Sequence, residues 1–251
     1  MKRVTQKVVK EVVGSTTTTA VAVKSYPTIV KEYFVEQSKL DVDCKKNAPG
    51  MKHYMKDQFP FLGFKSPTRT SLLKSMIKLH GLPPSDDDIM PIYQSQHREF
   101  AYIAIELTLQ RVKKSEPDKT RIKMYEEMIM YNSWWDTVDL IASNLVGQHF
   151  KRFPEQRLEY TEKWIKSDNN WLKRSALLFQ LKYKKETDTD LLFRYIGETM
   201  SETDFFIRKA IGWSLREYSK VDKNIIIKYV DQHSTKLSTL SQREALKHCT
   251  K

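Results

Sequence analysis

The sequence of 251 residues has little of several features that mark particular classes of protein. Its seven glycines and the lack of a clear hairpin signal leave little room for a β-sheet. No run of about 18 apolar residues occurs, so we expect no membrane span. The N-terminus lacks the compact apolar segment and cleavage site of a secretory signal. These absences favour an intracellular, mainly helical protein.

The chain also lacks the residue patterns that hold metals and nucleotides. Cys44 and Cys249 lie near opposite ends of the chain, and neither has a Cys or His companion at metal-ligand spacing. We expect both to be free thiols. No Gly-rich phosphate loop is present. The function should therefore need neither a metal nor a nucleotide cofactor.

Positive charge is in excess, and the excess is uneven along the chain. The formal net charge is +12, and residues 151–251 carry twenty-one basic against fourteen acidic side chains. Residues 25–150 are almost balanced. A basic half suits a polyanion such as DNA, because each phosphate contact releases condensed counterions. Lysine-rich solvated helix faces give the same composition, so charge alone leaves both interpretations open.

Helix-length apolar patterns begin near residue 24 and recur along the rest of the chain. Short polar joints separate them, among them SDNN at 167–170, TDTD at 187–190 and SETD at 201–204. After residue 97 the expected helices form pairs with a period of roughly 35–40 residues, each pair too one-sided to bury its apolar face alone. This pattern predicts an all-α stacked helical-repeat solenoid. A four-helix bundle or a globin-like packing is the alternative.

The chain divides into a tail and a body. Residues 1–23 are rich in Thr and Val with scattered Lys and show no helical period, so we expect a flexible basic tail. Their β-branched residues would also suit a short strand. Residues 24–251 should form a single helical-repeat domain.

The stretch YNSWWDTVDL at 131–140 places two adjacent tryptophans before two aspartates. With Ser133 as N-cap, Asp136 falls at the third helical position and completes a capping box. The motif would then open the first helix of a pair. Trp134 starts a core-facing stripe that continues at helical spacing through Val138, Ile141 and Leu145.

Trp135 and Asp139 are left over from this pattern. They lie four residues apart, stacked on one helix face beside the core stripe. Asp139 is too far into the helix to cap it. Two interpretations remain open. Either Trp135 packs under a neighbouring helix while Asp139 pairs with an arginine, or both face a functional site.

Two further segments contain residues that their core faces do not use. In NNWLKRSALLFQLKYK at 169–184, Arg174 lies among apolar neighbours, and such an arginine usually has a carboxylate or phosphate partner. In DFFIRKAIGWSLREY at 204–218, Trp213 points away from the core beside Gly212. Glycine inside a helix costs about 1 kcal/mol relative to alanine, so we expect something to approach that surface closely. Ordinary packing remains the alternative for each residue taken singly.

Several segments, in the same order along the chain, resemble the DNA alkylation-repair glycosylase family of the AlkD type. The resemblance covers roughly residues 50–250, and its specific motifs are SWWD-x-VD and AIGW-x-LREY. An N-terminal extension has no counterpart that we can place. The matching segments are HYMKDQFPFLG at 53–63, REF at 98–100, SWWDTVD at 133–139, KWIKSDNNWLKRSALLFQLKYK at 163–184, FFIRKAIGWSLREY at 205–218 and LSQREALKH at 240–248.

The resemblance implies a HEAT-like helical-repeat fold, present as a monomer, whose concave basic face grips duplex DNA. It implies removal of purines alkylated at ring nitrogens 3 or 7, in a nucleus or nucleoid. Trp135 and Trp213 would contact the sugar and backbone of the damaged nucleotide. Asp139 would be the catalytic carboxylate and Arg174 the basic residue near the lesion phosphate. Tyr54 would line the same cleft.

Two other classes of function remain beside the glycosylase. Some relatives in this family bind DNA without excising bases, so a noncatalytic DNA-structure-binding repeat protein is one alternative. Retention of the tryptophans, the carboxylate and the arginine argues against it. A helical-repeat scaffold for other proteins would need an apolar or acidic groove, whereas the basic half indicates phosphates.

Overall fold

The computed structural model describes residues 24–249, and within these residues every regular element is helical. The predicted tail at 1–23 lies outside the described residues. The helices in chain order are α1 (Tyr26–Leu40), α2 (Val42–Tyr54), α3 (Ser66–His80), α4 (Ile89–Tyr93), α5 (Arg98–Val112), α6 (Arg121–Met130), α7 (Trp135–Leu140), α8 (Gly147–Arg152), α9 (Pro154–Ile165), α10 (Asn170–Leu178), α11 (Thr189–Thr199), α12 (Phe205–Ser219), α13 (Lys223–Gln232) and α14 (Thr239–Ala245).

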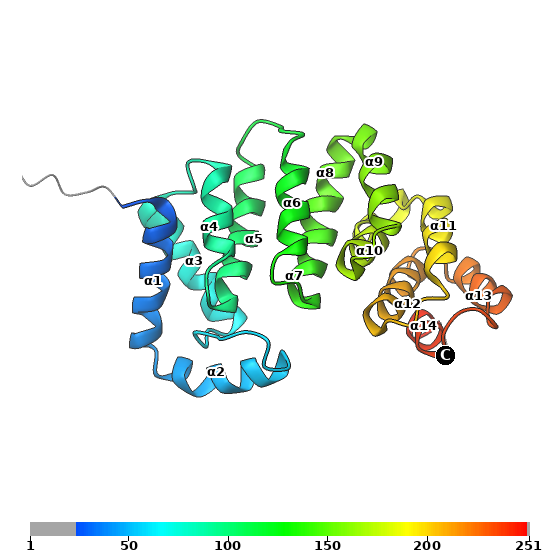
Figure 1. Ribbon diagram of the computed structural model, residues 1–251, viewed down its shortest axis with the longest axis horizontal. Helices are drawn as coiled ribbons and strands as arrows, with labels where there is room; N and C mark the ends of the chain where they lie inside the picture. Colours follow the sequence, from blue (N-terminus) through cyan, green and yellow to red (C-terminus); the bar gives the residue numbers. More distant parts are fainter. Residues whose placement is uncertain (1–23, 250–251) are drawn as a thin grey trace, which may run out of the picture.

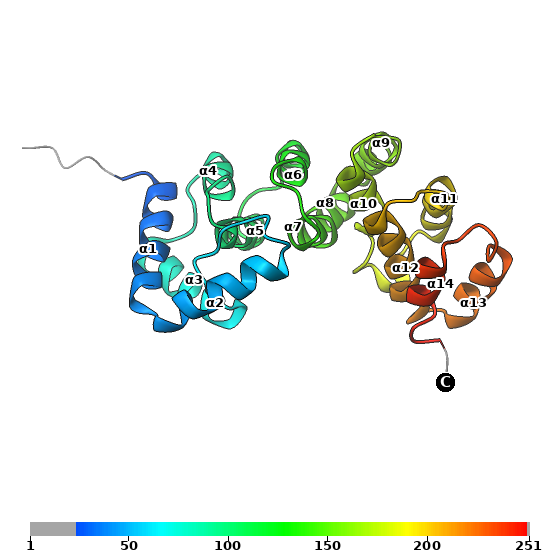
Figure 2. The same ribbon diagram turned by 60° about the horizontal axis from the view of Figure 1, so that its bottom comes forward.

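The helices follow one another along the longest axis of the molecule. In Figures 1 and 2, α4 to α10 stand side by side in chain order, α2 lies across one edge, and α11 to α14 continue the row at a tilt. This serial arrangement confirms the all-α helical-repeat prediction and excludes the four-helix bundle and the globin-like packing. Within the described residues, no helix has the length and apolarity to cross a membrane.

Hydrogen bonds between neighbouring repeats confirm the period of the sequence. Tyrosine hydroxyls repeatedly bond to a group about one period away. Tyr93 donates to the Met128 carbonyl at 2.8 Å across 35 positions, and Tyr183 donates to the Gly147 carbonyl at 2.6 Å across 36 positions. Each such bond ties one repeat to the next, so the register of the stack is fixed by specific polar contacts as well as by apolar packing.

Polar residues in the predicted joints cap the N-termini of the helices that follow them. The Asn169 side chain accepts from the Trp171 amide at 2.9 Å, and the Asp204 side chain accepts from the Phe206 amide at 2.8 Å. Asp188 caps α11 in the same way. Each cap satisfies amides that have no partner inside the helix.

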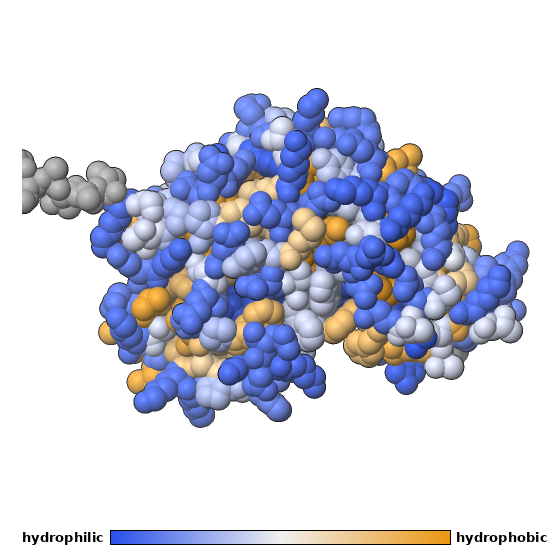
Figure 3. Space-filling model, viewed as in Figure 1, coloured by the Kyte–Doolittle hydropathy of each residue, from blue (hydrophilic) through white to orange (hydrophobic). Residues whose placement is uncertain are grey.

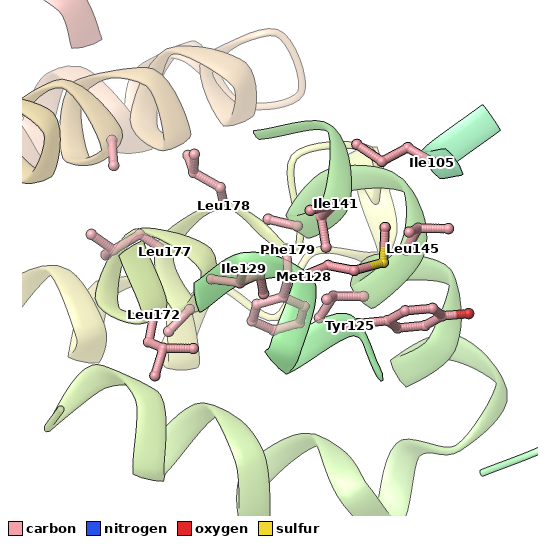
Figure 4. Packing of buried hydrophobic residues seen from close by; sticks show 14 of the residues in the cluster. Ile105, Tyr125, Met128, Ile129, Ile141, Leu145, Leu172, Leu177, Leu178 and Phe179 are labelled. Atoms are coloured by element: carbon pink, nitrogen blue, oxygen red, sulfur yellow. The ribbon is translucent and has the colours of Figure 1, made fainter. Parts of the chain in front are cut away.

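The core runs continuously through the stack and is built from one face of each helix. Figure 4 shows apolar side chains from α5, α6, α10 and the segment after α7 meeting between the layers. Val138, Ile141 and Leu145 are each at most 3% exposed, as the helical spacing predicts. The predicted stripe is therefore core from Val138 onward.

The start of α7 differs from the prediction in three ways. The N-cap is Trp134, which makes no side-chain capping bond, and the Ser133 hydroxyl instead donates to the Ile129 carbonyl. The Asp136 carboxylate, only 5% exposed, pairs with Arg98 of α5. The predicted capping box is thus wrong, because the Asp136 carboxylate pairs with a buried guanidinium from the neighbouring repeat instead of bonding to the helix cap. In Figure 1, α7 also follows α6 as the second helix of its pair, which corrects the expected order.

A π-helical segment, Ile141–Val146, connects α7 to α8 without a break. The Ser143 hydroxyl donates to the Asp139 carbonyl at 2.6 Å, and the Asn144 amide donates to the Leu140 carbonyl at 2.8 Å. Both side chains therefore donate to backbone carbonyls of the two residues that precede the π-helical segment. Such π segments are uncommon and occur often at functional sites. This one directly follows Asp139.

We predict that Asp136→Asn destabilises the fold by about 3–5 kcal/mol, because removing one partner leaves the buried Arg98 guanidinium uncompensated. Chemical denaturation measures the change. Asp190→Asn provides the control, since Asp190 is an exposed carboxylate in the first turn of α11. It should cost at most about 1 kcal/mol through the helix dipole. Equal small losses in both variants would show that Asp136 acts as a surface carboxylate.

Candidate active site

One open cavity of about 330 Å³ is lined by residues that the predicted core stripes do not use. Three successive repeats supply four residues that the sequence singled out. Its lining comprises Trp135 and Asp139 of α7, Arg174 of α10, Phe205, Phe206, Lys209, Trp213 and Arg216 of α12, and Glu244 of α14. Since α7, α10 and α12 all begin at the same edge of the stack, side chains from these three helices meet there.

Asp139 and Arg174 form a buried bidentate ion pair inside this cavity. Nε of Arg174 donates to Oδ1 of Asp139 at 2.7 Å, and Nη2 donates to Oδ2 at 2.8 Å. The side chains are only 11% and 4% exposed, respectively. Burial raises the pKa of the Asp139 carboxyl, while the hydrogen bonds from Arg174 act in the opposite direction. The expectation that Asp139 pairs with an arginine is therefore met, and its partner is itself a predicted site residue.

Trp135 projects from the first turn of α7 toward Tyr54. The two rings are 6.1 Å apart in an edge-to-face arrangement. Tyr54 is 68% exposed at the end of α2, and it lines a second hollow beside the cavity rather than the cavity itself. Trp135 is half-buried. Tyr54 and Trp135 thus form a partly exposed aromatic pair at the boundary between the two hollows.

Glu99 holds the loop that follows Tyr54, a role that the sequence analysis did not predict. It is fully buried, and its carboxylate accepts the amides of Leu62, Gly63 and Phe64 at 3.0, 2.8 and 3.2 Å. The adjacent Arg98 holds α7. One charged dipeptide at the start of α5 therefore positions both sides of the aromatic pair. Two charged residues that open an apolar helix are the only sequence signal of this role.

Trp213 of α12 also lines the cavity, together with a group of charges that the sequence did not single out. Glu244 accepts from Lys209 at 2.8 Å and from Arg216 at 2.7 Å. The bond from Lys209 is the main reason that the pKa of Glu244 lies below its usual value. The cavity therefore contains a second carboxylate and two more cations, which come together only because α14 packs onto α12.

Gly212 permits that packing. A Cβ on Gly212 would lie 2.5 Å from the Glu244 Cβ and 2.8 Å from the Ser241 carbonyl oxygen. The close approach predicted at this glycine is thus made by α14 of the same chain. The absence of a side chain lets Glu244 enter the cavity.

An aromatic cluster lies beneath the mouth of the cavity. Trp134 packs against Phe206 and Trp171, with ring centroids 5.2 and 5.8 Å apart. Trp134 is half-buried and its indole N–H has no partner, so its assignment to the core stripe is wrong. Phe205 is 56% exposed at the rim. Figure 3 shows apolar patches along this edge of a mostly hydrophilic surface, one of them over α12.

The fold and the cavity define a helical-repeat protein with one cleft of aromatic, acidic and basic side chains. In the part of the chain that the structure describes, no group of three His, Cys, Asp or Glu side chains is placed to hold a metal. The family model for the DNA alkylation repair enzyme matches residues 40–249, and the chain belongs to that family. Membership gives it a role in DNA alkylation repair, with DNA as substrate.

A solved structure agrees with this assignment. It is described as a predicted DNA alkylation repair enzyme from Enterococcus faecalis and shares 33% of its sequence with this chain, at a TM-score of 0.73. The match covers 82% of this chain and 96% of the other. A search of curated proteins finds no significant match.

We predict that Gly212→Ala destabilises the protein by about 1–3 kcal/mol, because the added methyl group overlaps α14. Gly197→Ala in α11 is the matched control, since a Cβ there meets nothing within 4 Å. That variant should be neutral or more stable by up to about 1 kcal/mol. Thermal and chemical denaturation compare the two. Stabilisation by both changes would contradict the close contact between α12 and α14.

Proposed function

We propose that the protein is a DNA glycosylase that hydrolyses the N-glycosidic bond of cationic alkylated purines in duplex DNA. The observation that carries this proposal is the meeting of Trp135, Asp139, Arg174 and Trp213 in one cavity, although they come from three repeats. Membership in an alkylation-repair family makes DNA the substrate. The side chains in the cavity suit the sugar and phosphate of a nucleotide.

The reaction does not require the protein to protonate the leaving base. A purine alkylated at ring nitrogen 3 or 7 is already positively charged, so its glycosidic bond is weak and the base departs without further protonation. The sugar then acquires oxocarbenium character. A carboxylate close to the anomeric carbon stabilises that charge and orients the attacking water. We assign this role to Asp139, whose ionised form is favoured by the hydrogen bonds and charge of Arg174 against the effect of burial.

The two tryptophans supply aromatic faces to the same cationic centre. Cation–π attraction contributes on the order of 0.5–2 kcal/mol per contact, and more as water is excluded. Trp135 and Trp213 both line the cavity and are only half-buried, so their rings remain available to a nucleotide. Tyr54, edge-on to Trp135, extends this aromatic surface along the DNA.

Arg174 has two proposed roles. Through Nε and Nη2 it fixes the orientation of the Asp139 carboxylate. The N–H groups that neither Asp139 nor the Phe206 carbonyl uses are free for the phosphate beside the lesion. The first role follows from the contacts in the structure. The second follows from the resemblance in sequence.

The duplex would lie along the edge where the second helices of the pairs begin. We propose that this edge is the concave basic face, and that the basic half of the chain neutralises the phosphates there. The free backbone amides at the helix N-termini along this edge would also attract the phosphates. The cavity is open, so the damaged base need not be enclosed. Neutral lesions such as uracil and oxidised guanine should then be poor substrates, because they lack the positive charge.

We expect Asp139→Asn to slow release of the alkylated base by at least about 10-fold, which is about 1.4 kcal/mol of transition-state stabilisation. The amide keeps the size of the side chain but cannot stabilise the oxocarbenium ion. Free methylated purines released from alkylated duplex DNA are measured under single-turnover conditions. Affinity for undamaged duplex should change little.

Asp188→Asn is the matched control, because Asp188 also pairs with an arginine, Arg157, but lies outside the cavity. It should release purines at the parental rate. Equal rates for the Asp139 variant and the parent would refute the assignment of Asp139. Tight DNA binding without release by the parent would instead support the noncatalytic DNA-structure-binding function.

Arg174→Ala separates the two roles of the arginine. Loss of the guanidinium raises the pKa of Asp139 further, and only the ionised carboxylate is active, so the acid limb of the rate profile should move to higher pH. Loss of a phosphate contact should also make the plot of log affinity against log salt shallower by about one unit. An unshifted pH limb would remove the orienting role, and an unchanged salt slope would remove the phosphate contact.

A further inference from the structure

Arg69, in the first turn of α3, differs from the other sheltered arginines of the described chain. The arginines at 98, 111, 121, 157, 174 and 216 each pair with a carboxylate, and the arginine at 208 bonds a carbonyl. Within the described residues, the only side-chain bond of Arg69 is a long one to the Ser66 hydroxyl at 3.5 Å. Arg69 is half-buried, and burial lowers the pKa of its guanidinium. Glu99 and Glu106 stabilise its charge, but neither forms an ion pair with it in the described residues. A partly desolvated guanidinium with no paired carboxylate is costly, so an anion would bind it favourably.

A rigid support holds the guanidinium in place. Its carbon lies 4.5 Å from the centre of the Tyr102 ring. The Tyr102 hydroxyl donates to the Asp136 carboxylate at 2.5 Å, and Asp136 is held by Arg98. A cation stacked on an aromatic ring keeps its edge N–H groups free for a ligand. Arg69 is therefore positioned by the same network that positions α7.

The guanidinium faces a hollow of about 570 Å³ that is separate from the candidate active site. Lys46 of α2 and Lys65, the residue before α3, also line it and are exposed. Neither lysine makes an ion pair with a carboxylate in the described part of the chain. The first turn of α3 has no acidic residue and no side-chain cap. Cations and free amides converge there, with no acidic side chain in the lining of the hollow.

Tyr54 connects this hollow to the candidate active site. It lines the hollow and lies edge-on to Trp135, which lines the cavity of Asp139. We propose that Arg69, stacked on Tyr102 and assisted by Lys46 and Lys65, binds a backbone phosphate of the DNA, a few nucleotides from the damaged one. The proposal rests on the function proposed above, because it requires that a duplex occupy the cavity of Asp139.

The site matches a phosphodiester better than other anions of the cell. A guanidinium binds two phosphate oxygens with parallel N–H bonds, and the lysines add charge without demanding a fixed geometry. The tyrosine rings provide stacking surface for the sugar and base beside the phosphate. Binding here would fix the position of the strand relative to Trp135, and so the register of the damaged nucleotide over Asp139.

The test is a scan of duplexes that carry one alkylated purine and a single neutral methylphosphonate, moved position by position. The parent protein should lose affinity when the methylphosphonate replaces the phosphate held by Arg69. Arg69→Gln should lose affinity for the unmodified duplex but become insensitive to substitution at that one position. Its salt dependence should be shallower by about one unit.

Arg152→Gln is the matched control, because Arg152 is exposed at the opposite end of the helical stretch that Trp135 begins, about 25 Å away. It should keep the parental sensitivity at every position. If Arg69→Gln does not fold, the double variant Lys46→Gln and Lys65→Gln should show the same reduced sensitivity. A parent and a variant with identical scans would overturn the proposal while leaving base release as evidence for the glycosylase. A parent that binds no duplex would overturn both.

Discussion

Two buried ion pairs hold α7 from opposite sides, and the arrangement of the cleft depends on them. Asp136 pairs with Arg98 of the preceding repeat, and Asp139 pairs with Arg174 of the following one. The carboxylates lie three residues apart on one helix and would repel each other without their partners. Because each pair crosses to a different neighbour, α7 can neither slide nor turn without breaking one of them. Trp135, the residue before Asp136 on the same helix, is held in position by the same two pairs.

The period of the repeats makes these pairs possible. Arg98 and Asp136 are 38 positions apart, and Asp139 and Arg174 are 35 apart, which are the separations that also link tyrosines and carbonyls elsewhere in the stack. Equivalent positions of successive repeats lie side by side, so a side chain at a helix start meets its counterpart one period away. The second helices begin along one edge, and this edge collects charged and aromatic residues. Beside this cleft, Tyr54 and Arg69 line a separate hollow.

Much of the fold could be predicted from the sequence, because helix period, joints and repeat length are local patterns. Val138 and Ile141 are core as their spacing predicts. Trp134 is not, because its ring packs against residues of later repeats, and no local pattern shows a partner that far along the chain. Asp136 was misread as a capping residue for the same reason. Gly212 correctly signalled a close approach, but α14 as the partner follows only from the packing of the last repeat.

The assignment of chemistry to the pair of Asp139 and Arg174 is tested most directly by removing both partners together. Replacing a buried ion pair by apolar residues of similar size is often neutral for stability, so Asp139→Leu with Arg174→Met should remain folded. The measurement is the release of free methylated purine from alkylated duplex DNA by this double variant. Our account predicts a folded protein that binds duplex DNA and releases purine no faster than the uncatalysed reaction. Release at the parental rate would show that the pair serves the fold alone and would contradict the account.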